Sequence, residues 1–582
     1  MKSAKATVVQ VPFTPTRVGG YLDRTSDTAS ASLANPKPMK PRHRNYLFIS
    51  AIVVGACLVW PYVCSTARAA TIWYVSPSGN DANAGTSWAA AKRTVQAAVN
   101  AATGADTVLV TNGVYVLSSS LNITNAIALT SVNGSSSTIL DGQHASRCVT
   151  IDGVAATVNG FTLQNGRAAV VGGGAYCNGG TIQNCLLANN QAIGDEVNTA
   201  QGGGVYVAYG TLSNCVVVSN VAENTNSYSA AWGGGVNCYG SIVHSCLVSN
   251  NLCSAGQAFG GSAFGGGVFL TAGELRNSRV LANSATALST AYGGGVYATI
   301  MQLAVPSLVE VCVVASNNAN TTDTDLYTGA ESTGGGLYIG NGTTVRSTLV
   351  YRNIAQSANG FTSAGGVSAG GSTLENCTIA NNQATTQNGH PGVGGGVTWG
   401  VDDQCYNNII KLNSADNGSD NGEIDSLSYP ILVNSDLGPI VPAAKELNCI
   451  SADPLFVNAA GGDYRLQPAS PCVSAGTNMD WMVGALDLAG NNRLSGGIVD
   501  IGAYEYVQSN PRPALNLPTR PSGSQFRFLL NGTGGQNYTI QYSVTLTNWT
   551  SLLVTNAPTS SFTVTDSSAT NAFRFYRVLV GP

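Results

Sequence analysis

The chain has 582 residues, of which only 10% are charged and 69 are glycine, whereas an average soluble domain has about 25% charged residues and about 7% glycine. This composition excludes coiled coils and helical bundles, which need charged helix-forming residues. A hydrophobic share of 44%, with 23 tyrosines and 7 tryptophans, excludes wholesale disorder and indicates a fold that buries small and β-prone side chains.

Charge is distributed unevenly along the chain. Residues 1–69 hold nine Lys or Arg and two Asp or Glu, whereas the remainder holds 17 basic and 28 acidic residues. This negative balance argues against nucleic acid as a partner. The three histidines beyond residue 69, His144, His244 and His390, are far apart in sequence, which argues against a histidine-based metal site.

An uncharged apolar segment spans residues 46–63. It follows four basic residues between positions 37 and 44 and precedes the small-x-small site Ala67-Arg68-Ala69. This order predicts a signal peptide within residues 46–69, cleaved after Ala69, and leaves residues 1–45 as a basic extension that a start at Met39 would largely remove. An uncleaved membrane anchor and lipidation at Cys57 are the alternatives. All three predict an exported protein at the cell surface, in the outer membrane or outside the cell, which meets a membrane only through this segment or a surface anchor.

Glycine triplets recur at a regular interval in the middle of the chain. Their last glycines, with that of Ala-Gly-Gly at residues 364–366 included, stand at residues 174, 204, 235, 267, 295, 336, 366 and 396, and a period of about 30 residues predicts a solenoid. Each unit also carries an asparagine at one position, which we expect in a left-handed turn, with its amide bonded to its counterpart in the next coil. This structural ladder comprises Asn165, Asn190, Asn220, Asn251, Asn283, Asn317, Asn353, Asn382 and Asn413.

Apolar residues alternate after each glycine triplet, and a second apolar run precedes each asparagine. Because no segment of the repeats has helical spacing, we expect two or three short strands per turn in parallel register, an all-β parallel β-helix over residues 70–510. Five cysteines share one repeat position and are interpreted as small buried hydrophobic residues with free thiols: Cys185, Cys215, Cys246, Cys312 and Cys377. Cys449 and Cys472, outside the repeats, are the candidates for a disulfide.

An aromatic stripe stands two residues after the last glycine of several triplets and is the best binding feature. It comprises Tyr176, Tyr206, Phe269, Tyr297 and Tyr338, with Asn237 interrupting. Alternation turns these rings outward, about 4.8 Å apart, where they either stack on the sugar rings of a polysaccharide or only stiffen the sheet. Trp232, Phe264 and Tyr292, just before three triplets, form a second, loop-borne candidate patch.

Acidic residues cluster in two places. The segment with Asp416, Asp420, Glu423 and Asp425 has oxygen ligands for calcium, the one cofactor considered, although its glycines do not fit an EF-hand and an ordinary acidic loop is the alternative. The pair Asp402-Asp403 is interpreted as a solvated turn. No constellation of carboxylates with a basic residue for a lyase is evident.

A proline-rich linker and strand-like, aromatic-rich runs follow residue 510. Residues 511–582 are therefore predicted to form a linker and a small β-sandwich domain. Its role is interpreted as a spacer or anchor, with carbohydrate binding by Trp549 as the alternative.

The body resembles right-handed parallel β-helix proteins of the pectin-lyase-like superfamily. The entry segment at residues 73–81, the predicted capping helix within residues 85–102, the GGGVY and NCxxxxN units and the closing motifs at residues 453–457, 463–466 and 500–506 look like those of polymorphic outer-membrane proteins and of the choice-of-anchor Q type. The resemblance implies the fold and a surface location. Because lyases, hydrolases and adhesins share this fold, two functions stay open: a non-catalytic protein that binds polysaccharide or another surface ligand, and a polysaccharide lyase or glycoside hydrolase.

Overall fold

The computed structural model describes residues 68–582, except for 226–229, 257–259, 301–304, 324–328, 389, 425–429, 439–444, 495–496, 508–512, 572 and 582. Of the predicted signal segment, residues 46–67 lie outside the described residues. None of the helices within the described ranges is long and apolar enough to cross a membrane.

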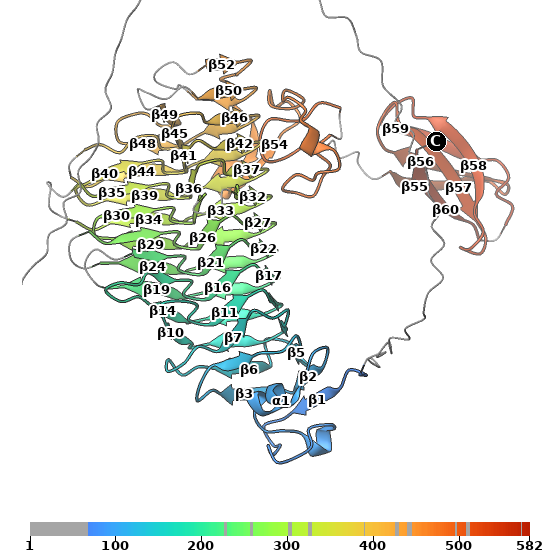
Figure 1. Ribbon diagram of the computed structural model, residues 1–582. Coiled ribbons are helices and arrows are strands. Elements are labelled where there is room, and N and C mark those ends of the chain that lie inside the picture. Colours follow the sequence, from blue (N-terminus) through green and yellow to red (C-terminus); the bar gives the residue numbers. More distant parts are fainter. Residues whose placement is uncertain are drawn as a thin grey trace, which may run out of the picture. The chain divides into compact units, whose positions relative to one another are not determined.

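The body is a parallel β-helix, as predicted, with its coils stacked in chain order (Figure 1). One complete coil consists of β11 (Ala175–Asn178), β12 (Thr181–Gln183), β13 (Leu186–Ala188), β14 (Gln191–Ile193) and β15 (Ala200–Gln201). The next coil begins with β16 (Val205–Ala208), which pairs in parallel with β11. The central coils therefore contribute to five sheets, and the expectation of two or three strands per turn is wrong.

We number these sheets 1 to 5 in the order in which the chain enters them after a glycine triplet. Besides the strands of that coil, sheet 1 contains β4 (Leu121–Ile123), β7 (Val149–Asp152), β21 (Val236–Tyr239), β26 (Val268–Thr271), β31 (Val296–Thr299), β36 (Leu337–Gly340), β41 (Val367–Gly370), β45 (Val397–Trp399) and β49 (Gly422–Ile424). Sheet 2 contains β1 (Ile72–Val75), β2 (Thr107–Val110), β5 (Ala128–Ser131), β8 (Thr157–Asn159), β17 (Thr211–Ser213), β22 (Ile242–His244), β27 (Glu274–Arg276), β32 (Leu308–Glu310), β37 (Thr344–Arg346), β42 (Thr373–Glu375), β46 (Gln404–Tyr406), β50 (Ile431–Val433) and β52 (Lys445–Leu447).

The remaining three sheets follow the same stacking. Sheet 3 contains β3 (Gly113–Val116), β6 (Thr138–Asp141), β9 (Thr162–Gln164), β18 (Val216–Val218), β23 (Leu247–Ser249), β28 (Arg279–Leu281), β33 (Val313–Ala315), β38 (Leu349–Tyr351), β43 (Thr378–Ala380), β47 (Ile409–Lys411) and β51 (Asp436–Leu437). Sheet 4 contains β10 (Arg167–Ala169), β19 (Val221–Asn224), β24 (Leu252–Ala255), β29 (Ser284–Ala287), β34 (Asn318–Thr321), β39 (Ile354–Ser357), β44 (Gln383–Thr386) and β48 (Ser414–Ala415). Sheet 5 contains β20 (Ala230–Trp232), β25 (Ser262–Phe264), β30 (Thr290–Tyr292), β35 (Glu331–Thr333) and β40 (Phe361–Ser363).

Two separate cores hold the coils together. Sheets 1 to 3 enclose the main core, in which branched side chains such as Val205, Leu212 and Val217 are fully buried. Sheets 4 and 5, which we call the fin, pack on each other through small side chains such as Ala222 and Ala231. Alanine gives little strand signal, which explains why the fin was not predicted from the sequence.

The asparagine ladder lies between sheets 3 and 4. From Asn190 to Asn413, each buried side chain donates from Nδ2 to Oδ1 of the next asparagine at 2.9 Å. The left-handed residue is not the ladder asparagine, as predicted, but the residue before it, with φ between 53° at Arg352 and 62° at Leu412. The left-handed residue turns the chain so that the side chain of the following ladder asparagine points inward. There its amide takes the place of backbone hydrogen-bond partners.

Asn165 does not belong to the ladder. It is itself left-handed, with φ 52°, and its side chain donates to Asp141. Gly166 occupies the ladder position of this coil and donates its N–H to Asn190 Oδ1 at 2.7 Å. A Cβ there would lie 2.8 Å from that oxygen, so the first coil of the ladder accepts only glycine.

The N-terminal end is capped, but by a shorter helix than predicted. A 3-10 turn (Trp88–Ala90) precedes α1 (Val95–Ala101), whose N-cap is Thr94. Val95, Ala98 and Val99 on α1 are buried in the main core. The helix thus covers the open first coil, as a capping element does.

The closing segment packs on the outside of sheet 3. Its hairpin, β53 (Phe456–Asn458) and β54 (Asp463–Leu466), with 3-10 turns at Ala459–Gly461 and Asp480–Met482, contributes to a second hydrophobic cluster with Leu349 of β38. Within this segment, Arg493 is fully buried and donates to Glu505 Oε1 at 3.0 Å and to Ser347 Oγ at 3.2 Å. This buried network fastens the segment to the coils.

The C-terminal residues form two three-stranded antiparallel sheets, in agreement with the predicted β-sandwich. One contains β55 (Ala514–Ser522), β56 (Gln525–Asn531) and β59 (Ser561–Asp566); the other contains β57 (Asn537–Ser543), β58 (Thr550–Asn556) and β60 (Phe575–Val580). Part of the proline-rich linker is therefore an edge strand, β55, whose register with β56 is broken twice, as expected for a strand that contains proline.

Candidate functional site

The two aromatic patches predicted separately form one cluster in the structure. The stripe Tyr176, Tyr206, Phe269, Tyr297 and Tyr338 lies on sheet 1, and Trp232, Phe264 and Tyr292 lie on strands of sheet 5, not on loops. Rings of the two sheets are in contact, for example Phe264 with Tyr297 at 5.0 Å between centroids. The eight residues fill the junction between the fin and sheet 1, and we call them the aromatic corner.

The rings of the aromatic corner stack mainly on one another. Tyr176 stacks on Tyr206, with centroids 5.5 Å apart and planes 7° apart. Phe269 stacks on Tyr297 at 5.2 Å, and Tyr297 on Tyr338 at 4.9 Å. Within the stripe Phe269 is 2% exposed, and the others are half-buried. Most ring faces are therefore covered by other rings, as in a ladder that stiffens a sheet.

Burial also changes the acidity of the tyrosines. It raises the pKa of Tyr297 to about 12 and raises the pKa of Tyr206 and Tyr338 as well. The Tyr292 hydroxyl donates to Glu331 Oε2 at 2.5 Å. These hydroxyls stay protonated at neutral pH, so the rings of the aromatic corner are uncharged. Charged groups lie at its edges, where Glu331 contacts Tyr292 and the Arg147 guanidinium lies 5.5 Å from the centre of the Tyr176 ring.

The stack is broken at one place, which is where Asn237 interrupts the stripe. Trp232 stacks on Phe269 at 4.8 Å, but no ring contact joins Tyr206 to either of them within the described ranges. A cleft of about 200 Å³ opens there. It is lined by Gln201, Tyr206, Trp232, Asn237, Tyr239, Phe269 and Thr271.

The predicted calcium loop is described only in part, and its two described carboxylates accept hydrogen bonds from the backbone. The Asp416 carboxylate accepts hydrogen bonds from the backbone of Thr386 and Gly392, and Asp420 accepts from Ala415 N–H at 3.0 Å. These carboxylates are turn acceptors. Asp425 and the side chain of Glu423 lie outside the described residues. In the part of the chain that the structure describes, no group of three or more His, Cys, Asp or Glu side chains is placed to hold a metal ion.

The Asp402-Asp403 pair is only partly the solvated turn that was predicted. Asp402 is exposed with φ 64°, whereas Asp403 is 2% exposed and accepts hydrogen bonds from Ser372 N–H and Oγ and from Gly400 N–H. Burial raises the pKa of Asp403 to about 6. Its three donors identify it as a structural acceptor between neighbouring turns.

The predicted disulfide between Cys449 and Cys472 is wrong, because both residues are free thiols. Cys472 is buried in the cluster under the closing segment and donates to Asp436 Oδ2 at 3.4 Å. Cys449 packs instead against the main core. The repeat cysteines, such as Cys185 and Cys215, are free and buried, as interpreted from the sequence.

Acidic and basic side chains converge on the outer face of sheet 2, a grouping that the sequence did not indicate. Glu310 binds Arg346 Nε at 2.6 Å and also pairs with Arg276. The Arg346 guanidinium lies 4.7 Å from the centre of the Trp481 ring, and burial raises the pKa of Glu375 in the next strand. Glu310, Arg276 and Arg346 are thus joined in ion pairs, and Trp481 of the closing segment covers the Arg346 guanidinium.

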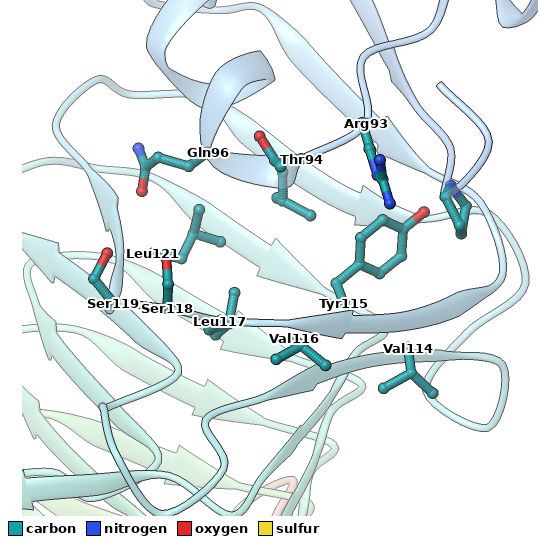
Figure 2. A pocket seen from close by; sticks show the side chains of 12 residues that line it. Arg93, Thr94, Gln96, Val114, Tyr115, Val116, Leu117, Ser118, Ser119 and Leu121 are labelled. Atoms are coloured by element: carbon teal, nitrogen blue, oxygen red, sulfur yellow. The ribbon is translucent and has the colours of Figure 1, made fainter. Parts of the chain in front are cut away.

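Two other surfaces are candidates for ligand binding. The ring of Trp549, the candidate in the C-terminal sandwich, has the Arg577 guanidinium 4.3 Å from its centre, so one ring face is covered. A cavity of about 480 Å³ lies between the start of α1 and β3. Figure 2 shows Arg93 on one side of it and Val114 and Val116 on the other. It has one charged lining residue and exposed apolar side chains, and none of the predicted site residues.

No protein-family model matches the chain, and no curated protein matches it. Solved structures with similarity to the chain include pectate lyase Pel9A (15% identity, TM-score 0.38, covering 75% of this chain and 96% of that one) and a rhamnogalacturonan lyase (13%, 0.30, 63% and 87%). A third is XylC in complex with xylose (9%, 0.35, 85% and 100%). At these values no activity or residue role is transferred to this chain.

Proposed function

We propose that this chain is an exported, surface-associated β-helix protein that binds a polysaccharide along the aromatic corner and has no catalytic activity of its own. The observation that carries the proposal is the cleft of about 200 Å³ at Asn237, where the aromatic stack opens between two rings. Aromatic faces beside amide groups are the usual combination for sugar recognition, because the rings contact the apolar face of a sugar and the amides bind its hydroxyls.

The arrangement of charges supports a binding role over a catalytic one. Lyase chemistry needs carboxylates that hold calcium and a free basic residue near the substrate. The strongest grouping of acids and bases lies on sheet 2, where Glu310 is bound by Arg276 and Arg346. Each of these groups is engaged in an ion pair, so none stands ready as a base.

A polysaccharide lyase or glycoside hydrolase is the second candidate function. The observation that favours it is the same grouping, because Glu375, whose pKa is raised by burial, lies beside Arg346. A carboxyl group with a raised pKa next to a basic group is one signature of acid–base chemistry. In this alternative the substrate would lie across sheet 2 and not in the aromatic corner.

One panel experiment separates the two functions. The exported protein is incubated with neutral and uronate polysaccharides, and bound polymer, new reducing ends and unsaturated products are measured. We expect retention of at least one polysaccharide without product. Release of product that is lost in Glu375→Gln would instead establish the enzyme, and retention by no polysaccharide would reject the binding role.

A further inference from the structure

Unlike the rest of the aromatic corner, the cleft at Asn237 has polar groups whose hydrogen-bonding capacity is not satisfied. In sheet 1, Asn237 pairs with Tyr206 in the preceding coil and with Phe269 in the following coil. Asn237 therefore occupies the position at which both neighbouring coils carry an aromatic ring. Its amide Nδ2 donates to Gln201 Oε1 at 3.4 Å, a long hydrogen bond. The Nε1–H of Trp232 is buried without a partner among the described residues, and buried donors in native proteins rarely lack one.

The size of the cleft fits one ring. Pockets for drug-sized ligands have about 300–1,000 Å³, whereas this cleft has about 200 Å³. Tyr206, whose one stacked neighbour in the described part of the chain is Tyr176, lines one side, and Trp232 lines another. A chain that runs along the corner would place a single residue here.

The lining contains no charged side chain. It consists of rings, the two amides of Gln201 and Asn237, and the Thr271 hydroxyl, which already donates to Thr299 O at 3.0 Å. A carboxylate or sulfate group placed here would find no cation and would lose its hydration. A neutral sugar offers hydroxyls that both donate to and accept from amides, and an apolar face for the rings.

We propose that the cleft at Asn237 is a subsite for one uncharged sugar residue, so that the polysaccharide bound by this protein is neutral and not a polyuronate. This inference rests on the proposed function and adds the substrate class and the position of the subsite. Asn237 and Gln201 bind hydroxyls, Trp232 Nε1–H donates to a ligand oxygen, and Tyr206 carries the apolar face of the sugar.

The test uses isothermal titration of the full exported chain with hexasaccharides of β-1,4-linked glucose, mannose and xylose, and with oligogalacturonate of the same length. We expect at least one neutral hexasaccharide to bind, and oligogalacturonate to bind roughly tenfold or more weakly. Asn237→Tyr completes the aromatic row and fills the cleft. It is expected to keep the melting temperature and to lose binding by roughly tenfold or more.

Two further variants keep the proposal falsifiable. Ser368→Tyr is the matched control, because Ser368 is the next member of the same row after Tyr338 and lies outside the cleft; its affinity should equal that of the wild type. Trp232→Phe keeps a ring but removes the N–H donor, and severalfold weaker binding is expected even if Asn237→Tyr does not fold.

Equal binding by wild type, Asn237→Tyr and Trp232→Phe would overturn the subsite but leave the proposed function intact. Tighter binding of oligogalacturonate would overturn the substrate class, and binding of nothing in the wider panel would reject the proposed function itself.

Discussion

Trp232 and Phe269 lie on different sheets, yet their rings are parallel within 6° and their centroids are 4.8 Å apart. Trp232 ends a strand of the fin, and Phe269 stands in sheet 1 one coil further on, after the glycine triplet at residues 265–267. The contact ties the fin to the main β-helix, and it leaves open the place beside Tyr206 where the aromatic stack stops. Stability and binding therefore depend on different rings of one cluster.

The first prediction concerns a ring inside the stack. Tyr297 contacts Phe269, Tyr338 and Phe264, so Tyr297→Ala should lower the free energy of unfolding by roughly 2 to 4 kcal/mol through lost stacking and burial. Urea unfolding followed by circular dichroism measures it. Phe361→Ala on the fin, where the ring is 51% exposed, is the control and should have a smaller effect; equal stability of wild type and Tyr297→Ala would show that the stripe is not structural.

The second prediction concerns the asparagine ladder. The Asn251 amide donates to Val217 O and Asn283 Oδ1, and its Oδ1 accepts from Asn220. Asn251→Leu leaves these buried groups without partners and should cost roughly 1 to 3 kcal/mol of unfolding free energy. Asn250→Gly, at the exposed left-handed position before it, should be nearly neutral. The ladder would be contradicted by a melting temperature unchanged in Asn251→Leu.

The third prediction is a pH dependence of stability in the closing segment. Burial raises the pKa of Glu505 to about 7, against the attraction of Arg493 and with the repulsion of Asp500, and Asp487 accepts the Glu505 N–H. Because the unfolded chain loses this proton near the ordinary pKa of 4.5, the unfolded state binds fewer protons between 4.5 and about 7, and stability falls as the pH rises through this window.

Thermal melts at about pH 5 and about pH 8 test this dependence. The wild type should melt at a lower temperature at the higher pH. Glu505→Gln mimics the protonated carboxyl group and should reduce the difference. A wild type that is more stable at the higher pH, or a Glu505→Gln variant with the same pH difference, would contradict the assignment.

The fourth prediction concerns the thiols. Cys449 is partly exposed, whereas Cys472 is buried, so alkylation of the native exported protein should modify Cys449 first and leave the repeat cysteines unmodified until unfolding. Peptide mapping by mass spectrometry without reduction measures both. A peptide that links Cys449 to Cys472 would show that the thiols found free are joined after export.

The fifth prediction concerns export. The small-x-small site at Ala67-Arg68-Ala69 predicts that the mature protein begins at Ala70. Sequencing of the N-terminus of the exported protein decides it. An intact N-terminus upstream of residue 46 in a membrane fraction would replace the signal peptide with an anchor.

The repeat pattern predicted the β-helix because period and alternation are local properties of the chain. Glycine-rich turns and asparagines that recur about every 30 residues are sufficient to identify a solenoid, and the alternation at Val205-Tyr206-Val207 is sufficient to turn Tyr206 outward. The fin has no such pattern, because Ala222 and Ala231, which face each other across its two sheets, are small residues that carry no periodic hydrophobic signal.

The sequence alone was sufficient to predict the solenoid, its aromatic row and the interruption of that row at Asn237. Only the tertiary structure decided that Trp232 belongs to the same cluster, that the stacked rings cover one another's faces, and that an uncharged cleft remains at Asn237. The physical reason is that the register of strands along one sheet follows from the repeat length, which can be read from the sequence. Contact between two sheets depends instead on how the chain bends at each glycine triplet, and the sequence of a single coil does not determine that bend.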